Sequence, residues 1–463
     1  MNIVWGLGGM LGLLVIAVLF STNRRAISPR VVLAALALQF GFGVLVLFVP
    51  AGRAALTAAS SGVQAVIDSS RAGIEFLFGP VLPEDGLIFA FQVLPVIVFF
   101  ASLMSVLYHL GWLQKFVELL GGALSWVIGR ERVVSVNAAA NIFVGQTEAP
   151  LVIRPYIKGL SRSGLFAVMV GGLSTVAGSV LVGYNLLGAN LDYLIAAAFM
   201  AAPGALLMAS IMVPEDGTMS TAPAEGDDSE SGDAGEDTDT DEPEGTAEDK
   251  GATESEGAQD EGAAVSEGGE SEGGEGKGTE DKEADDEMAS MRHRNLIDAA
   301  AAGASDGLTL ALNIGAMLLA FISLIALLNL ILGGVAGLFG YPDLTFEIVL
   351  GYLFAPVMTL IGVPWGEAVN AGTFVGQKIV LNEFVAFSQF GPVVDQFTPK
   401  TAAIITFALT GFANLGSLGI LLGGLGGIAP TRRGDIATLG MRAVLAGTLA
   451  NLMSAAIAGM LLV

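Results

Sequence analysis

Long apolar segments recur along this chain at the length that crosses a lipid bilayer. Runs of about 20 residues, apolar at nearly every position, match the ~30 Å hydrocarbon core when they are helical. Eight such segments are expected to span the membrane: residues 3–20, 31–49, 87–110, 165–187, 191–213, 311–339, 401–425 and 436–463. The pattern therefore predicts an all-α polytopic membrane protein with about eight transmembrane helices.

Three further segments are helical in pattern but too polar for a crossing. Residues 54–84 carry Asp68 and Glu75 among apolar positions, which favours an amphipathic helix on the outer surface. Residues 111–128 show the same pattern on the cytoplasmic side, and residues 346–360 repeat it outside.

Basic residues between the apolar segments predict the orientation of the chain. Arg24, Arg25 and Arg30 follow the first segment, and Arg432 and Arg433 precede the last. The excess of Lys and Arg in cytoplasmic loops places these residues inside, so we expect the N-terminus outside. The first segment lacks basic residues ahead of it and a small-residue cleavage site after it, which favours a retained helix over a signal peptide.

Two segments are expected to enter the membrane and turn back. Residues 136–156 begin beside Arg132 and end beside Arg154. Both arginines mark the inner side, so a single crossing would break the charge rule and a re-entrant hairpin satisfies it. Residues 362–392 form the second expected hairpin, which enters from the outside.

Two short sequence motifs occur in both hairpins. Val-Asn-Ala at 136–138 and Phe-Val-Gly-Gln at 143–146 recur at 369–371 and 374–377. Because the two hairpins enter from opposite sides, the duplication predicts an inverted repeat, as in many transporters.

This organisation divides the chain into five parts. They are scaffold helices with an external surface helix (1–110), an interfacial helix with the first hairpin and two spans (111–213), an acidic insert (214–290), a long scaffold span (291–345), and a surface helix with the second hairpin and two spans (346–463).

The charge of the chain is concentrated in the insert. The 463 residues carry a formal charge of −24, but residues 215–290 alone contain 29 Asp and Glu against 3 Lys. The remainder has 16 acidic and 18 basic residues, so the membrane body is nearly neutral. The insert lacks aromatic and most large aliphatic residues, which predicts a disordered cytoplasmic segment; solvation is favoured over a binding role.

Polar side chains inside the two re-entrant segments are the candidate chemistry. Glu148 lies in the first and Glu383 in the second, although a central carboxylate costs about 2.5 to 3.5 kcal/mol in a bilayer. Four uncharged polar residues accompany them: Asn141, Gln146, Thr147 and Asn414. The surplus of neutral donors and acceptors favours a neutral ligand with many hydroxyl groups.

Each hairpin is followed by a span whose middle is too small and polar for an unbroken helix. Residues 174–179 and 411–417 are these middles, and both are expected to be unwound and to line a cavity. Lys378 lies five residues before Glu383. It is expected either to pair with a hairpin carboxylate or to snorkel to the interface.

Three motifs in order resemble the concentrative nucleoside transporter family. They are Gly-Gln-Thr-Glu-Ala-Pro at 145–150, Gly-x-Lys-x-x-x-Asn-Glu-Phe-Val-Ala at 376–386, and Gly-Phe-Ala-Asn at 411–414 followed by Ser-Leu-Gly-Ile at 417–420. The resemblance covers about residues 130–463 without the insert. It implies a sodium-coupled importer, a homotrimer in the cell membrane, and a mobile transport domain that moves like an elevator against a scaffold.

The resemblance also implies a role for each matching residue. The nucleobase would contact Gln146, Thr147, Glu148 and Val180. The ribose would be held by Glu383, Asn414 and Ser417, with Phe412 packed on the solute. Sodium would bind the side chains of Asn141 and Thr175 and the carbonyls of Val144 and Val176, and no other cofactor is implied.

Two features temper or extend the resemblance. Thr175 stands where a related member has Ser, which keeps the hydroxyl but crowds the ion site, and the acidic insert is not a family hallmark. Gly145 together with Ser179 resembles broadly selective members, so both purine and pyrimidine nucleosides are expected as substrates.

Three alternatives compete with sodium-coupled uptake. Proton coupling would use Glu148 or Glu383 as the carrier. A membrane enzyme is disfavoured because the chain has no cysteine, only two histidines and no nucleophile paired with a base. A passive channel is disfavoured because re-entrant hairpins with polar tips suit occlusion better than continuous conduction.

Overall fold

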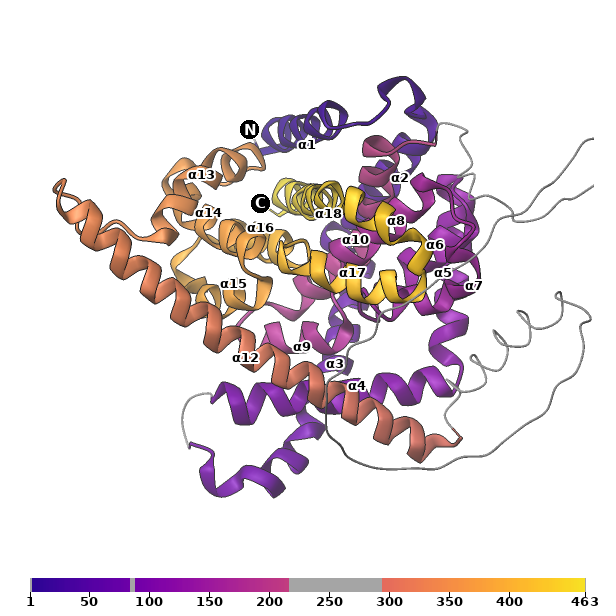
Figure 1. Cartoon of the computed structure of the whole chain (residues 1–463), viewed down its shortest axis with the longest axis horizontal. Coiled ribbons are helices and arrows are strands. Elements are labelled where there is room, and N and C mark those ends of the chain that lie inside the picture. The colour runs from indigo at the N-terminus through magenta and orange to yellow at the C-terminus, as the bar shows by residue number, and fades with distance from the viewer. Residues whose placement is uncertain (1, 84–87, 216–293, 463) are drawn as a thin grey trace, which may run out of the picture. The chain divides into compact units, whose positions relative to one another are not determined.

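The computed structural model of the chain describes residues 2–83, 88–215 and 294–462. Regular structure in these ranges is entirely helical (Figure 1). The helices are α1 (Asn2–Leu19), α2 (Pro29–Gly43), α3 (Pro50–Phe78), α4 (Leu94–His109), α5 (Trp112–Ile128), α6 (Arg132–Ala140), α7 (Arg154–Ile157), α8 (Arg162–Ser174), α9 (Gly178–Leu186), α10 (Leu191–Met212), α12 (Leu296–Gly337), α13 (Phe346–Leu360), α14 (Trp365–Val380), α15 (Glu383–Phe390), α16 (Pro399–Leu409), α17 (Gly416–Ile428) and α18 (Arg433–Leu461). Short 3-10 and π turns join or extend several of them.

The expected membrane-crossing segments are all helical. Six helical segments are long and apolar enough to span a bilayer: Pro29–Phe48, Phe89–His109, Arg162–Leu186, Leu191–Met212, Leu296–Gly337 and Pro430–Leu461. The two other predicted crossings appear as shorter apolar helices, namely α1 and the divided pair α16 and α17. The prediction of an all-helical polytopic membrane protein is therefore confirmed.

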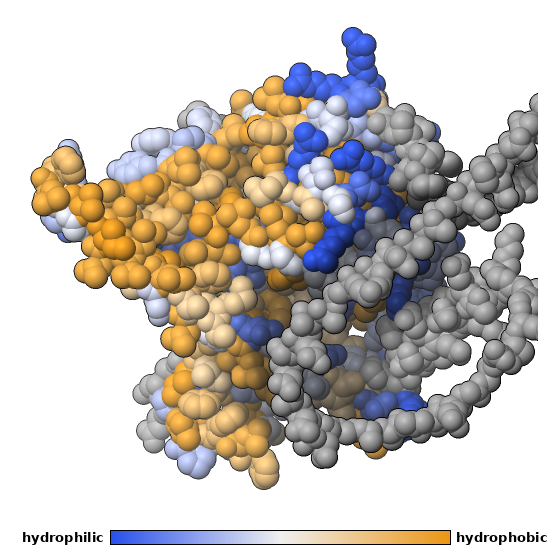
Figure 2. Space-filling model, in the orientation of Figure 1, coloured by the Kyte–Doolittle hydropathy of each residue, from blue (hydrophilic) through white to orange (hydrophobic). Residues whose placement is uncertain are grey.

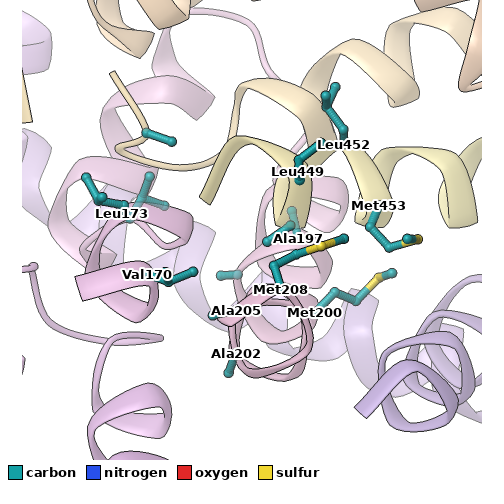
Figure 3. Close-up of a cluster of buried hydrophobic side chains, with 14 of the residues drawn as sticks. Val170, Leu173, Ala197, Met200, Ala202, Ala205, Met208, Leu449, Leu452 and Met453 are labelled. Carbon is teal, nitrogen blue, oxygen red and sulfur yellow. The ribbon is translucent and has the colours of Figure 1, made fainter. Parts of the chain in front are cut away.

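Three segments form the enclosed centre of the protein. We compared how much of the most apolar 18-residue stretch of each segment is buried. The buried share is 94% in Arg162–Leu186 and in Leu191–Met212, and 89% in Pro430–Leu461, but only 17% in Leu296–Gly337. Figure 3 shows side chains from these central helices meeting in one cluster, including Val170 and Leu173 of α8, Met200 and Met208 of α10, and Leu449 and Met453 of α18. Small residues let these helices approach closely, which builds a dense body around the unwound segments.

Helix α12 begins earlier than the sequence predicted. The expected span started at residue 311, but the helix starts at Leu296 and contains 42 residues. Its first part is rich in small residues, which weaken the apolar signal. There Gly303 and Gly307 lie so close to α4 that a Cβ on either would come within 2.7 Å of an atom of Ala101. Close packing against α4 therefore accounts for the additional turns.

The outer face of α12 is apolar and exposed. Leu312, Leu319, Leu330 and Leu338 are 62%, 74%, 74% and 83% exposed. Figure 2 shows the hydrophobic colour that covers the end of this helix on the left of the view. Such a surface is unfavourable in water and suits contact with lipid or another protein surface.

The two hairpins differ in secondary structure although they share sequence motifs. In the first, α6 is followed by an irregular segment at residues 141–148 and then by short helical turns up to Ile157. In the second, α14 and α15 are continuous helices that meet at Leu381 and Asn382. The Phe-Val-Gly-Gln motif is thus irregular in the first hairpin and helical in the second. Helix α13 precedes the second hairpin at a bend of 116° to α14.

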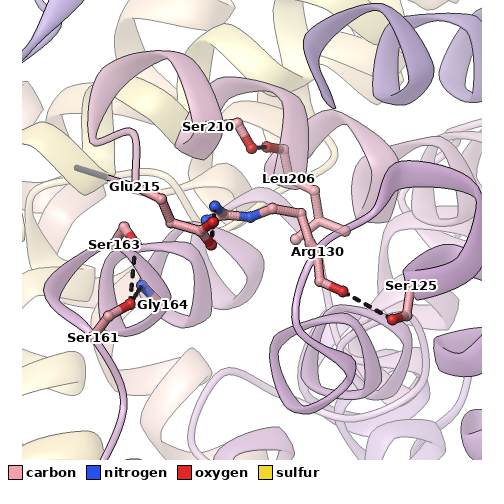
Figure 4. Close-up of polar contacts among 8 residues, drawn as sticks. All are labelled: Ser125, Arg130, Ser161, Ser163, Gly164, Leu206, Ser210 and Glu215. Atoms are coloured by element: carbon pink, nitrogen blue, oxygen red, sulfur yellow. Dashed lines mark hydrogen bonds and ion pairs between the residues drawn. The ribbon is translucent and has the colours of Figure 1, made fainter. Parts of the chain in front are cut away.

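The start of the insert is attached to the first hairpin's entrance. The Arg130 guanidinium donates a hydrogen bond to the Glu215 carboxylate, and the Arg130 carbonyl accepts one from Ser125 Oγ at 2.8 Å (Figure 4). Arg130 is 6% exposed, so the ion pair compensates a buried charge. The predicted disordered insert otherwise falls on residues 216–290, outside the described residues.

Candidate functional site

Two interrupted helices meet at the centre of the protein. Residues 175–177 separate α8 from α9, and residues 410–415 separate α16 from α17. The Phe412 backbone N–H donates to the Thr175 carbonyl at 3.2 Å, which joins the two unwound segments directly. Both interruptions fall where small and polar residues predicted them. Interruptions of this kind offer backbone groups that can bind a solute or an ion.

Glu383 is held between both halves of the chain. It is the first residue of α15, whose N-cap Asn382 accepts from Val385 N at 2.9 Å. One carboxylate oxygen accepts from Tyr184 Oη at 3.1 Å, and the other from Asn414 Nδ2 at 3.0 Å. The helix N-terminus and the two donors offset part of the cost of burying this carboxyl group.

The neighbours of Glu383 are themselves fixed by hydrogen bonds. Asn414 Oδ1 accepts from Ser417 N at 2.8 Å, which orients the amide so that its nitrogen faces the carboxylate. Leu415 N donates to Ile379 O at 3.1 Å and ties the unwound segment to α14. Asn414 and Ser417 are buried, and Phe412 is half-buried beside them. The structure thus brings the predicted ribose-side residues together.

The tip of the first hairpin packs against α8 and α17. A Cβ on Gly172 of α8 would lie 2.8 Å from Cβ of Gln146, and one on Gly424 of α17 would lie 2.7 Å from Cγ2 of Thr147. Gln146 is buried, and its Oε1 has no hydrogen-bond partner among the described residues. Glu148 is exposed and accepts from Gly145 N at 2.9 Å.

Two of the predicted base-side residues, Gln146 and Thr147, are therefore positioned by neighbouring helices. The fourth of them, Val180 on α9, is 1% exposed and contributes to the packing of the body.

The predicted ion ligands lie where the first hairpin meets the first interruption. Gly178 N donates to Phe143 O at 3.0 Å across this junction. Asn141 is fully buried, its Nδ2 donates to Asn137 O at 2.9 Å, and its Oδ1 has no hydrogen-bond partner among the described residues. A buried oxygen without a donor suits a hard cation.

The second half of the predicted ion site is on the unwound segment. Thr175 Oγ1 donates to Gly171 O at 2.8 Å, so its lone pairs remain able to accept. Val176 is buried and Val144 is half-buried on the two sides of the junction. Gly171 leaves room for the Asn141 amide, because a Cβ there would lie only 3.2 Å from Asn141 Nδ2.

Sequence reasoning did not identify Tyr184 or Asn451, and it misplaced Lys378. Tyr184 is fully buried and stacks on Phe387 with ring centroids 4.4 Å apart. Lys378 is 1% exposed, so the snorkelling interpretation is wrong. Its Nζ donates to the Ala408 carbonyl and to Asn451 Oδ1, both at 2.8 Å, rather than to a carboxylate. A lone Asn in the last apolar span was the available signal for Asn451.

Three family models cover almost the whole chain. The model for the Na+ dependent nucleoside transporter C-terminus matches residues 193–459, and the model for the N-terminus of the same transporters matches residues 8–81. A nucleoside recognition model matches residues 90–190, which include the first hairpin.

Curated relatives and solved structures agree with these models. The chain is 48% identical to the uncharacterized transporter YutK of Bacillus subtilis, over 99% of this chain and 100% of that protein. It is 42% identical to the nucleoside permease NupC of Helicobacter pylori, over 98% and 96%. CNTnw in an inward-facing substrate-bound state superposes with a TM-score of 0.82 at 44% identity, covering 100% of this chain and 98% of CNTnw. An interrupted central helix pair, two re-entrant hairpins and matches of this extent lead to one assignment: the chain belongs to the concentrative, Na+ dependent nucleoside transporter family of multi-pass membrane proteins.

Proposed function

We propose that this chain imports nucleosides by secondary active transport coupled to the sodium gradient. The observation that carries the proposal is the buried Glu383 carboxylate, held by Tyr184 and Asn414 between the two repeats. A carboxylate in this position accepts hydrogen bonds from the vicinal hydroxyls of a ribose, and such charge-assisted bonds are strong. Asn414 and Ser417 would complete the sugar site, and Phe412 would pack on the solute.

The first hairpin would receive the nucleobase. Gln146 offers an amide, Thr147 a hydroxyl and Glu148 a carboxylate, and together they can answer the mixed donors and acceptors of a base edge. Val180 would supply an apolar contact. The unpartnered Gln146 Oε1 supports this role because a ligand donor would satisfy it.

Sodium would bind between the first hairpin and the first interruption. The side-chain oxygens of Asn141 and Thr175 and the carbonyls of Val144 and Val176 form an all-oxygen set. An ion there would hold the hairpin against the unwound segment and so organise Gln146 nearby. Each ligand would then strengthen the binding of the other by thermodynamic linkage.

Transport itself would proceed by an elevator movement within a homotrimer. CNTnw has been solved in inward-facing, outward-facing and intermediate states, which supports alternating access in this chain. The dense central body would be the mobile part, and the exposed apolar face of α12 supports a scaffold role in contact with neighbouring copies or lipid. We place the N-terminus outside and the insert in the cytoplasm. The mass of the detergent-solubilised protein tests the trimer, and labelling of single cysteines from each side tests the topology.

Uptake into proteoliposomes tests the proposed function. Labelled uridine and adenosine are offered with an inward sodium gradient, a proton gradient or no gradient. We expect accumulation of both nucleosides only with sodium. Uptake that persists without sodium and collapses with the pH gradient would instead establish proton coupling through Glu148 or Glu383.

The acidic insert is expected to be dispensable for transport. A chain that lacks residues 225–280 offers the same membrane body, because the deleted residues contain almost no apolar side chain for packing against it. We expect uptake rates within about twofold of the full chain, a change typical of an unconstrained surface segment. Complete loss of uptake by a correctly inserted protein would show that the segment binds something that transport needs.

A further inference from the structure

A buried lysine and a buried asparagine connect the second hairpin to both interrupted helices. Lys378 of α14 reaches the end of α16, where Nζ donates to the Ala408 carbonyl at 2.8 Å, and donates equally closely to Asn451 Oδ1 on α18. Lys378 is 1% exposed and Asn451 is 2% exposed.

Asn451 continues the connection to the other repeat. Its Nδ2 donates to the Ser174 carbonyl at 2.7 Å and to the Thr410 carbonyl at 2.8 Å. Ser174 is the last residue of α8, immediately before the first interruption, and Thr410 directly follows α16 as the first residue of the second interruption. The contact is tight, because a Cβ on Gly411 would come within 2.2 Å of Asn451 Oδ1. One amide therefore holds the chain where each interruption begins.

The position of this pair relates it to both proposed ligands. Ser174 is directly followed by Thr175, a proposed sodium ligand, and Thr410 is two residues before Phe412, which is proposed to pack on the nucleoside. Lys378 is on the same hairpin as Glu383. Helix C-termini attract cations because their last carbonyls lack intrahelical partners. The ammonium and the amide fill that need here.

We infer that Lys378 and Asn451 form a coupling junction that transmits sodium binding at the first interruption to nucleoside binding at the second. Ordering of Ser174 and Thr175 by the ion fixes Asn451, which in turn fixes Thr410 and, through Lys378, the hairpin that carries Glu383. The two are positioning residues and touch neither ligand. The inference rests on the proposed function, since it requires both ligands to bind.

The coupling factor between the two ligands tests the junction. Uridine affinity of the purified protein is measured by calorimetry with saturating sodium and with choline in its place. We expect sodium to lower the uridine Kd by about tenfold or more in the unmodified chain, within the usual range of such coupling. In Lys378→Met and in Asn451→Leu we expect this factor to fall below about threefold.

Two features separate coupling from simple stabilisation. If the residues act through their shared bond, the double variant loses no more coupling than either single variant. Gln39→Leu is the matched control. Gln39 is buried and donates to Ser454 Oγ at 2.9 Å, one turn from Asn451, and its side-chain hydrogen bonds among the described residues go to α18 and not to either interruption. We expect it to lower the melting temperature and leave the coupling factor unchanged.

Asn451→Ser keeps a hydroxyl donor and replaces Asn451→Leu if the leucine variant does not fold. We expect its coupling factor to lie between those of the unmodified chain and Lys378→Met.

The possible results separate the coupling junction from the proposed sodium-coupled transport. A full coupling factor in folded Lys378→Met and Asn451→Ser would overturn the junction alone. Uridine binding without any sodium effect in the unmodified chain would overturn both the sodium assignment and the junction.

Discussion

Glu383→Gln is expected to abolish uridine uptake while the protein stays folded. Tyr184 and Asn414 each donate to one oxygen of the carboxylate. In a glutamine side chain an NH₂ group replaces one of these oxygens, so it would face a donor and could not accept a hydrogen bond. Hydrogen bonds to a charged group contribute about 1.5 to 3 kcal/mol each. Loss of two such bonds to ribose hydroxyls would weaken binding by at least about a hundredfold. Uridine-dependent thermal stabilisation and proteoliposome uptake measure the effect.

A second glutamate of the same hairpin provides the control. Glu367 on α14 accepts from Thr398 N and from Thr398 Oγ1, both at 3.0 Å, and is half-buried away from the interruptions. We expect Glu367→Gln to retain uptake. Normal uptake by Glu383→Gln would remove the carboxylate from the sugar site, and a misfolded Glu383→Gln is recognised by its loss of a cooperative melting transition.

Asn141→Ala is expected to raise the sodium concentration for half-maximal uptake by about tenfold, the cost of roughly one hydrogen bond or ligand of 1.4 kcal/mol. The change removes the unpartnered Oδ1 but leaves the backbone bond between Phe143 and Gly178 that holds the hairpin in place. Uptake at saturating sodium should therefore remain near the original rate. A sodium titration of initial uptake rates measures the shift.

The control for this change is an asparagine of the interrupted span that follows the first hairpin. Asn185 donates to Ala189 O at 3.0 Å at the far end of α9, and we expect Asn185→Ala to leave the sodium dependence unchanged. An unaltered half-saturation in Asn141→Ala would exclude its side chain as an ion ligand.

Much of the architecture could be predicted because membrane burial leaves a strong signal in sequence. Runs of about 20 apolar residues identified the crossings, and basic residues on both sides of residues 136–156 identified a hairpin that a hydropathy pattern alone would have taken for a span. The small and polar centres of two spans correctly predicted their interruptions. The early start of α12 was missed because small residues support a helix by packing against α4, a contact that no local pattern reveals.

Contacts within the site were harder to predict because they join distant parts of the chain. Tyr184 and Glu383 are 199 positions apart, and Asn451 and Ser174 are 277 apart. Lys378 illustrates the difficulty. A basic residue in an apolar helix suggests either a carboxylate partner or the interface, whereas its actual acceptors are a helix-end carbonyl and an amide. The roles of the individual ligand-binding residues stay predictions that follow from the motifs.

The length of α12 sets how the protein sits in its lipid environment. From Leu308 to Leu338 this helix presents exposed apolar side chains over about 45 Å at 1.5 Å per residue, whereas the hydrocarbon layer is about 30 Å thick. An upright helix would leave about 15 Å of this apolar surface outside the hydrocarbon layer. A tilt of about 45° would place the whole face inside it, well beyond the average tilt of about 20°. Tilting is a common way for a long apolar helix to match a thinner bilayer, so the tilt of α12 would be expected to follow the length of the acyl chains.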